Sequence, residues 1–586
     1  MAATPAILFT NGKIFQSGVE PGTNAGLHRE PTFASCMLIR GSQIEHVGSP
    51  SDEPIAAALA ASSSSPDNSS STASSTTVVR DLGGRTVLPG FVDGHMHLML
   101  LGQALNKLDL GKCRTLDEIQ ATVRAHAAAH PEAPRILARG WMHSMTPDGV
   151  SAADLDGLAD DPTTGRDRPV LVDSKDLHST WCNTAALAEL GADAWPDVPG
   201  GIISRNPVDG RPTGLFSEAA NMTYVWPFLS RVATIEERVA AVESAVRAYH
   251  AAGYTGMIDM AMDEGGWEAL QAWRKERERK QKEGGGEDGD VAGPGMRIAA
   301  YWLVRPSERV EDALGQVDRA IQLAREFGPT TTPDCRLVGI KLICDGIVDA
   351  CTAGLTEPYA HNGQVTVPLW TREHVEPVVR RADEAGLQIA LHAIGDATIS
   401  MAVDVLARYA NPARRPRVEH LELTSEEDAT RLGTARITAS IQPVHADPAI
   451  LRAWPRLLGE HRCGRAFAYR DLADKGAPLA LGSDAPTAPH APLGNIYVGT
   501  TRRSYRDPAA GDSPVNPHFA LGLCEAIAAA TEGAAYSCFD DHRFGALRKG
   551  LKADFVVLDN MEWDKDKVAT ATVAETWLDG VKVWSS

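Results

Sequence analysis

Short apolar runs alternate with helical stretches through the middle of the chain. Helical stretches such as TIEERVAAVESAVRAYHAAG separate the apolar runs. Eight runs are candidates for buried strands, namely TVLPGFVDGH, AAGYTGMIDMA, MRIAAYWLV, CRLVGIKLICDG, GLQIALHAIGD, RPRVEHLEL, ARITASIQPV and APLALGSDAP. Strands that alternate with helices indicate a parallel sheet. Eight such units predict an α/β fold, a (β/α)8 TIM-like barrel over residues 87–546.

The two ends of the chain show a different pattern. Residues 6–48 alternate short β-rich runs with Asn-Gly and Gly-Ser turns, and the last forty residues return to short strands with turn signals at DNMEWD and LDGVK. Such alternation is typical of antiparallel strands. We expect residues 5–86 and 547–586 to form one composite β-sandwich.

Three segments interrupt these patterns. Residues from about 111 to 225 are rich in Trp, Pro and Gly and predict an inserted subdomain that forms part of a pocket. A serine-rich stretch at 61–78 has too little apolar content to fold alone. A charged helix end leads into a glycine-rich stretch within 272–295. Both are expected to be flexible surface loops without a catalytic role.

Composition narrows the class of partner. The net charge of -19 and the pI near 5.4 disfavour nucleic acid or an anionic membrane as the main partner, since both need a basic surface. Nine cysteines without a Cys-x-x-Cys pair indicate reduced thiols. The start has no basic region before an apolar core, and no apolar run approaches the length of a membrane span. We therefore expect a cytoplasmic enzyme that acts on a small molecule.

Candidate chemistry begins in GFVDGHMHLM, residues 91–100. Successive side chains of a strand face opposite sides, so His95 and His97 share one face. Two imidazoles that converge on one point suit a metal such as zinc, although a hydrogen-bonded pair at a strand end would give the same pattern.

Other reactive side chains stand at the ends of later predicted strands. Lys341, His392, His420 and Asp484 occur in GIKLICDG, IALHAIGD, PRVEHLEL and LALGSDAP. The carboxyl ends of barrel strands meet at the face that carries the active site. Packing alone does not explain such a set.

These motifs resemble those of the amidohydrolase superfamily, specifically its amidohydrolase 3 (YtcJ-like) branch, and are similar to those of N-substituted formamide deformylases. The resemblance covers nearly the whole chain. It is carried by LPGFVDGHMHL, GWMHS, RPVLVDSKDLHSTWCNTAAL, GRPTGLFSEAA, KLICDG, LHAIGDATI, RVEHLEL, IQPVHADP, LGSDAPTAPHAPLGNIYVGTTR and LRKGLKADFVVLD.

The resemblance implies a binuclear metal centre, with zinc as the default metal. His95, His97 and Asp484 would hold one metal, and His392 and His420 the second. Lys341, carboxylated on its amine, would bridge the two, because a carbamate is an anionic oxygen donor whereas a lysine ammonium repels cations. An unmodified Lys341 would indicate a single metal.

The activity implied is hydrolysis of a carbon–nitrogen bond outside peptides, in an N-formyl or N-acyl amide. Metal-activated hydroxide would attack the carbonyl carbon, with Asp484 as general base. The alternatives are a mononuclear deaminase, which typically lacks a strand-end lysine such as Lys341, or another hydrolase on the same barrel. A non-catalytic scaffold is a third alternative, but scaffolds lose ligands and this chain has the full set.

Further residues receive supporting roles by the same resemblance. His178 is a candidate to hydrogen-bond the substrate carbonyl, and Trp141, Trp181 and Asn183 are candidates to line the pocket, with core packing as the alternative for the aromatic residues. Asp345 is a candidate to orient the lysine or its loop. Asp396 and Glu419 are candidates to orient neighbouring histidines. The family habit suggests a homodimer. Gly94 departs from the serine of many relatives, which leaves the exact substrate open.

Overall fold

The chain divides into two compact units. A computed structural model describes residues 6–17, 31–63, 77–160, 163–175, 179–198, 201–218, 220–283, 295–507 and 513–586. One unit comprises Met1–Leu98 with Val246–Ser586, and the other comprises Met99–Ala245. Within the described residues, none of the helices combines the length and the apolar character that crossing a membrane requires.

The first unit contains the predicted barrel. Its eight strands are hydrogen-bonded in the order β21-β20-β19-β18-β17-β16-β15-β8, and every neighbouring pair is parallel. This nearly closed parallel sheet confirms the predicted fold class. The strands are β8 (Phe91–Met96), β15 (Tyr254–Met262), β16 (Arg297–Leu303), β17 (Cys335–Ile343), β18 (Gln388–Ala393), β19 (Arg417–His420), β20 (Thr438–Ile441) and β21 (Leu479–Leu481).

The barrel strands are buried almost from end to end. In β8 all six residues are buried, and in β17 seven of nine are. Parallel strands are covered on both faces, so they appear in the sequence as continuous apolar runs rather than as an alternation. This is why the runs could be recognised as barrel strands.

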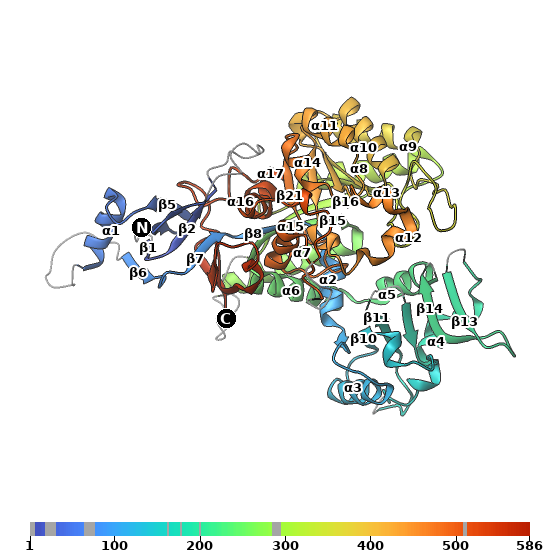
Figure 1. The fold of residues 1–586 in the computed structure, drawn as a ribbon. Coiled ribbons are helices and arrows are strands. Elements are labelled where there is room, and N and C mark those ends of the chain that lie inside the picture. Colours follow the sequence, from blue (N-terminus) through green and yellow to red (C-terminus); the bar gives the residue numbers. More distant parts are fainter. Residues whose placement is uncertain are drawn as a thin grey trace. The chain divides into compact units, whose positions relative to one another are not determined.

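Helices cover the outside of the barrel. In α9 the buried residues Val375, Val378, Val379 and Ala382 recur at helical spacing, so one stripe faces the sheet and the charged residues face outward. Figure 1 shows α8 to α11 as successive neighbours around the strands. The main helices are α7 (Glu264–Lys282), α8 (Val310–Glu326), α9 (Arg372–Glu384), α10 (Asp396–Tyr409), α11 (Glu426–Thr434), α14 (Tyr469–Asp474) and α15 (Pro492–Thr501).

Two glycines allow the first and last barrel strands to approach each other. A Cβ on Gly94 would lie 2.7 Å from the carbonyl oxygen of Leu481, and one on Gly482 would lie 2.4 Å from the backbone nitrogen of His95. The backbone N–H of Asp484 donates to the carbonyl of His95 at 2.6 Å, and the backbone N–H of His97 donates to the carbonyl of Ala485 at 2.9 Å. Backbone atoms block any side chain at position 94. This gives a local reason why the chain has glycine where many relatives have serine.

Strands from both chain ends share one sheet. This six-stranded sheet has the order β24-β23-β22-β7-β2-β3, and a second sheet has the order β5-β4-β1-β6. One cluster of buried side chains contains residues of both sheets, with Phe9 lying 5.2 Å from Phe555 and 5.3 Å from Trp577 between ring centroids. The strands are β1 (Ala6–Thr10), β2 (Lys13–Gln16), β3 (Thr32–Ala34), β4 (Cys36–Arg40), β5 (Gln43–Gly48), β6 (Thr77–Asp81), β7 (Thr86–Pro89), β22 (Phe555–Asp559), β23 (Thr572–Leu578) and β24 (Val581–Ser585).

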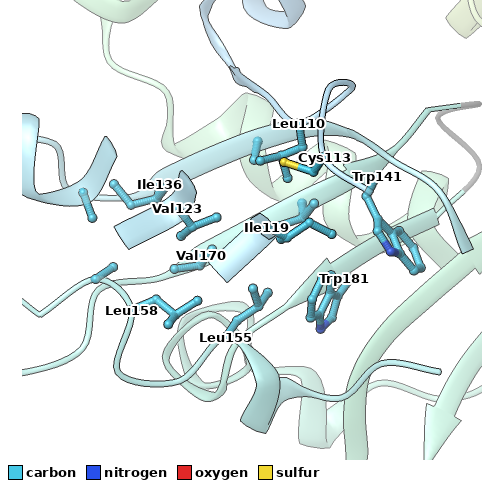
Figure 2. Close-up of a cluster of buried hydrophobic side chains, with 14 of the residues drawn as sticks. Leu110, Cys113, Ile119, Val123, Ile136, Trp141, Leu155, Leu158, Val170 and Trp181 are labelled. Atoms are coloured by element: carbon cyan, nitrogen blue, oxygen red, sulfur yellow. The ribbon is translucent and has the colours of Figure 1, made fainter. Parts of the chain in front are cut away.

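The second unit has a sheet and a core of its own. Its strands have the order β13-β14-β12-β11-β10-β9, and Figure 2 shows the apolar cluster that includes Trp141 and Trp181. Its elements include β9 (Leu108–Asp109), α3 (Leu116–Ala129), β10 (Ile136–Trp141), β11 (Val170–Ser174), β12 (Ser179–Cys182), α4 (Thr184–Leu190), β13 (Gly201–Arg205), β14 (Pro212–Glu218) and α5 (Trp226–Val232). Helices α2 (Leu98–Asn106) and α6 (Ile235–Ala251) lead into and out of this unit.

The segments expected to be loops fall partly outside the described residues. Residues 64–76 and 284–294 are not described. The remaining residues of these segments include the end of α1 (Glu53–Ser63), the start of β6 and the last turns of α7. Residues 272–282 are therefore helical.

Candidate metal centre

Five candidate ligands gather at the carboxyl ends of the barrel strands. His95 lies on β8 with His97 directly after it, His392 lies on β18, and His420 ends β19. Asp484 follows β21. The ring centroids of His95 and His420 lie 4.9 Å apart, and those of His392 and His420 lie 4.3 Å apart. Residues far apart in the sequence therefore meet at one end of the barrel, as the sequence predicted.

The Asp484 carboxylate faces the His-x-His pair. Its Oδ1 lies 3.4 Å from His95 Nε2 and 3.0 Å from His97 Nε2. His95, His420 and Asp484 each offer a ligand atom, and these atoms all lie within 4.8 Å of one another. Two imidazole nitrogens and a carboxylate oxygen form a donor set typical of a catalytic zinc site.

Several polar atoms at this site are buried without a hydrogen-bond partner. They are His95 Nε2, His97 Nδ1, His392 Nε2, His420 Nδ1 and Asp484 Oδ1. Buried polar atoms without partners are costly, and each normally has a reason in the chemistry of the site. A divalent cation coordinated by His95 Nε2 and Asp484 Oδ1 would satisfy both, so the residues fit a metal.

Burial keeps the imidazoles in the form that binds metals. It lowers the pKa of His95 to about 4 and that of His392 to about 3, and the nearby Lys341 acts in the same direction. Although burial alone would raise it, the imidazoles of His95 and His97 hold the pKa of Asp484 well below its usual range. Neutral imidazoles and an ionised carboxylate are the states a metal requires.

Lys341 lies in the barrel interior with a side chain that is almost fully buried. It belongs to β17, and its residue is 1% exposed. Burial lowers its pKa to about 8, so its amine loses its proton far more readily than that of a surface lysine. The neutral amine is the form that can take up carbon dioxide.

Glu419 sets the orientation of His95. Its Oε2 lies 2.7 Å from His95 Nδ1, and neither side chain is exposed by more than 1%. Arg417 donates from Nε to Glu419 Oε1 at 2.6 Å and from Nη2 to the carbonyl of Gly94 at 2.7 Å. A carboxylate that accepts from Nδ1–H leaves the lone pair of Nε2 free for a metal. This contact fits the role that the sequence suggested for Glu419, whereas the sequence did not indicate Arg417.

Asp93 ties the His-x-His strand to the Asp484 loop. Its carboxylate accepts from the backbone nitrogens of His95 and Ser483, at 3.1 and 2.8 Å, and from the hydroxyl groups of Ser483 and Tyr249, at 2.6 and 2.8 Å. Burial nevertheless raises its pKa to about 6. In the sequence, Asp93 stands two residues before His95. Its contact with Ser483 joins positions 390 apart, and nothing in the local sequence indicates that contact.

Two candidate ligands adopt strained backbone conformations. His420 has φ of 77° and Asp484 has φ of 57°, in the left-handed region that non-glycine residues rarely occupy. Such conformations cost of order 1–3 kcal/mol and cluster at functional sites. The strain fits a role for both residues in the site.

Asp345 and Asp396 have different roles. Asp345 accepts from the backbone nitrogens of Gly354, Ile394 and Gly395, and its Oδ1 lies 3.5 Å from His392 Nε2. It therefore holds two strand-end loops together. The expectation that Asp396 orients a histidine is corrected, because its carboxylate accepts from the backbone nitrogen and the hydroxyl group of Thr356. As the first residue of α10, it joins that helix to the loop after β17.

The proposed pocket residues of the second unit serve its own packing. Trp141 and Trp181 are both 0% exposed, and their indole N–H groups donate to Thr146 Oγ1 and the carbonyl of Ser151. Asn183 caps α4 and uses both its amide oxygen and its amide nitrogen in internal hydrogen bonds. Their burial supports the alternative that the two tryptophans pack in a core. The expectation that Asn183 lines a pocket is corrected, because its side chain is used within the unit. His178 lies outside the described residues.

Two further residues approach the site without having been predicted as ligands. His445 Nε2 lies 3.5 Å from Asp484 Oδ2, and its Nδ1 lies 3.4 Å from Glu422 Oε1. His445 lies in the motif IQPVHADP, and the sequence gave no signal for Glu422 other than its place two residues after His420.

Comparison with known proteins agrees with this geometry. A family model described as "Amidohydrolase family" matches residues 78–584. The chain is 28% identical to "Protein LONG AFTER FAR-RED 3" of Arabidopsis thaliana over 99% of this chain and 91% of that protein. It is 28% identical to "Putative amidohydrolase YtcJ" of Bacillus subtilis over 86% of this chain and 90% of that protein. It is 24% identical to "N-substituted formamide deformylase" of Arthrobacter pascens over 94% of each chain.

Solved structures share the fold. An uncharacterised metal-dependent hydrolase from Pyrococcus horikoshii superposes with a TM-score of 0.73 at 21% identity, over 96% of this chain and 98% of that chain. Atrazine chlorohydrolase TrzN from Arthrobacter aurescens, solved with zinc, gives a TM-score of 0.51 at 12% identity, over 99% of this chain and 95% of that chain.

Proposed function

This chain belongs to the amidohydrolase family, and we propose that it hydrolyses carbon–nitrogen bonds outside peptides, with N-formyl and N-acyl amides as its substrates. The observation that carries the proposal is the buried pair of His95 Nε2 and Asp484 Oδ1, 3.4 Å apart and each without a hydrogen bond. The similarity to a formamide deformylase over 94% of the chain supports the substrate class.

His95, His97 and Asp484 would hold the cation. When bound, a divalent metal polarises the substrate carbonyl and lowers the pKa of water from 15.7 to about 7, which supplies a nucleophile near neutral pH. Glu419 keeps Nε2 of His95 directed at the site through its contact with Nδ1. The second metal expected at His392, His420 and a carboxylated Lys341, and zinc as the metal, stay predictions.

Asp484 would move the proton. Its carboxylate is ionised at neutral pH and would accept the proton of the attacking water as the new carbon–oxygen bond forms. The same proton then passes to the departing nitrogen as the carbon–nitrogen bond breaks. The hydroxyl group of Thr487 donates a hydrogen bond to Asp484 Oδ2 at 3.0 Å and holds the carboxylate in place.

A substrate panel tests this proposal. Purified, zinc-loaded protein is offered N-formyl amines, N-acetyl amines and amino-substituted heterocycles, and amine, formate, acetate and ammonia are measured separately. We expect equal amounts of amine and carboxylic acid from the first two classes. Asp484→Asn should lower kcat/KM by about 10²-fold or more, since it removes the base. Asp540→Asn is the matched control, because Asp540 is a buried aspartate that pairs with Arg336.

Other products would contradict the proposal. Ammonia released from the heterocycles without amine from the amides would indicate a deaminase. No product from any class with metal loaded would indicate a scaffold. Within the proposal, the substrate is a small molecule rather than nucleic acid or membrane, while the cytoplasmic location and the homodimer stay predictions.

A further inference from the structure

The loop after α15 brings an arginine near the candidate metal centre. This loop comprises residues 502–507, and Arg502 at its start has φ of 61°, which turns the chain back along the helix. The ring of Tyr505 consequently lies beside the first turn of α15, where a Cβ on Gly494 would lie 2.5 Å from Tyr505 Cε1. The loop therefore returns to the end of the barrel at which α15 begins, shortly after Asp484.

Asp447 fixes the loop beside His445. Its Oδ2 accepts from the backbone nitrogens of Tyr505 and Arg506, at 2.9 and 3.1 Å. Asp447 is 0% exposed and lies two residues after His445. His445 Nε2 in turn lies 3.5 Å from Asp484 Oδ2. The backbone of Arg506 is thus tied to the turn that carries His445.

The positive charge of Arg506 also acts on His445. Burial lowers the pKa of His445, whereas the carboxylates of Glu422 and Asp484 raise it above its ordinary value. The guanidinium of Arg506 acts in the same direction as burial. Electrostatic effects between side chains weaken with distance, so the guanidinium as well as the backbone of Arg506 lies near the site.

The guanidinium of Arg506 has no carboxylate bound to it among the described residues. Its side chain is exposed to solvent, but partial burial still lowers its pKa, and the charge of Asp447 acts in the opposite direction. Burial likewise acts to lower the pKa of Arg417, yet the bound Glu419 raises it above its ordinary value. A partly enclosed cation without a bound anion is costly. The surroundings of Arg506 therefore favour an anionic ligand.

We propose that Arg506 binds a carboxylate of the substrate, so that the preferred amides of this site carry a carboxylate at a distance from the amide bond. A guanidinium offers two parallel N–H donors that match the two oxygens of a carboxylate. The inference rests on the proposed function, because it names the substrate class of the same site. Arg506 would be a specificity-determining residue that binds and positions the substrate.

The cations beside Arg506 favour a carboxylate over a phosphate group. Arg452 pairs with Asp507 at 2.8 Å. Arg503 pairs with Asp566 at 3.0 Å. A phosphate dianion is normally held by several cations, whereas one guanidinium suits a monoanion. Since the neighbouring arginines are engaged, the position suits a single carboxylate.

Matched substrates test the inference. The zinc-loaded full chain is offered pairs of N-formyl amines that differ only in a carboxylate or a methyl group at the end of a short, medium or long alkyl chain. In the wild type we expect kcat/KM to favour the carboxylate member of at least one pair by about 10-fold or more, through a lower KM. In Arg506→Gln this ratio should fall to about one, since the charged donor is lost. Arg279→Gln should keep the ratio and is the matched control, because Arg279 is an exposed arginine that pairs with Glu283 within α7.

A second readout does not depend on turnover. N-methylsulfonyl analogues of the same amines resist hydrolysis, and calorimetry measures their affinity for the zinc-loaded chain. Any contact of the sulfonyl group with zinc is common to both members of a pair and cancels in the ratio. We expect the carboxylate member to bind more tightly to the wild type, less so to Arg506→Lys and no more tightly than its partner to Arg506→Gln. Thermal melts confirm that each variant is folded.

The outcomes separate this inference from the proposed function. Equal affinity of both members in the wild type at every chain length, or a carboxylate preference that persists in Arg506→Gln, would overturn the inference. Hydrolysis of the amides without a carboxylate preference refutes the inference and leaves the proposed function intact. A carboxylate preference of the analogues that requires Arg506, without hydrolysis of any amide, refutes the proposed function and supports the binding role of Arg506.

Discussion

At the scale of single residues, buried hydrogen bonds from Arg417 to Glu419 and from Glu419 to His95 determine how the imidazole of His95 is oriented in the site. Arg417 and Glu419 are both 0% exposed, and the arginine offsets the cost of burying the carboxylate. Although burial acts in the opposite direction, Arg417 and His95 hold the pKa of Glu419 below its usual range. Glu419 therefore stays an anion that can accept from His95 Nδ1.

Glu419→Gln should weaken metal binding without unfolding the chain. A glutamine faces two neighbours that both donate, Arg417 and His95 Nδ1–H, and its own N–H₂ group opposes one of them. We expect a 10–100-fold loss of zinc affinity, the usual effect of removing an outer-shell partner. Zinc calorimetry measures it. Glu525→Gln is the control, because Glu525 is an equally buried glutamate paired with Arg470. Equal affinity in the wild type and Glu419→Gln would contradict this role.

The shared position of the candidate ligands could be predicted from the sequence, whereas the residues that hold these ligands in place largely could not. His95, His392, His420 and Asp484 each end an apolar run, so their shared position follows from the strand pattern alone. The contact of Glu419 with His95 joins positions 324 apart, and only its place beside His420 suggested a role. The pocket role of Asn183 was wrong, and the choice between pocket and core for Trp141 stayed open, because the capping and packing that occupy them depend on how the second unit folds.

At the scale of elements, the approach of β8 to β21 places His95 and Asp484 side by side. Gly94 and Gly482 leave room for the two backbones, and hydrogen bonds from Asp484 and His97 join them. The short β21, Leu479–Leu481, was recognisable as the eighth strand only because of its apolar run and the Gly-Ser-Asp that follows.

Gly94→Ala should therefore destabilise the barrel at its site. The added methyl group would lie 2.7 Å from the carbonyl oxygen of Leu481, so the strands must separate, at a cost of about 1–3 kcal/mol. We expect a lower Tm and weaker zinc binding together. Gly315→Ala in α8 is the matched control, because its Cβ meets nothing within 4 Å. That change should leave stability equal or raise it by up to about 1 kcal/mol. An equal Tm for the wild type and Gly94→Ala would refute the argument that Gly94 lets β8 and β21 approach each other.

At the scale of the whole molecule, the chain combines an amidohydrolase barrel with sheets built from both chain ends and a separate unit inserted after the first barrel strand. The barrel could be predicted because parallel strands appear as continuous apolar runs. Its relatives include a formamide deformylase and a plant protein whose name states no reaction. The retained donors His95, His97, His420 and Asp484 favour an enzyme over a scaffold.

The measurement that tests the central claim most directly is the metal content per chain of freshly purified protein and of its His95→Gln and Asp484→Asn variants, by mass spectrometry. The account predicts at least one equivalent of a divalent transition metal in the wild type. Each variant should lose about one equivalent or more and remain folded, since each removes a ligand of the first cation. Freshly purified wild type without a divalent transition metal, or unchanged metal content in both variants, would contradict the account.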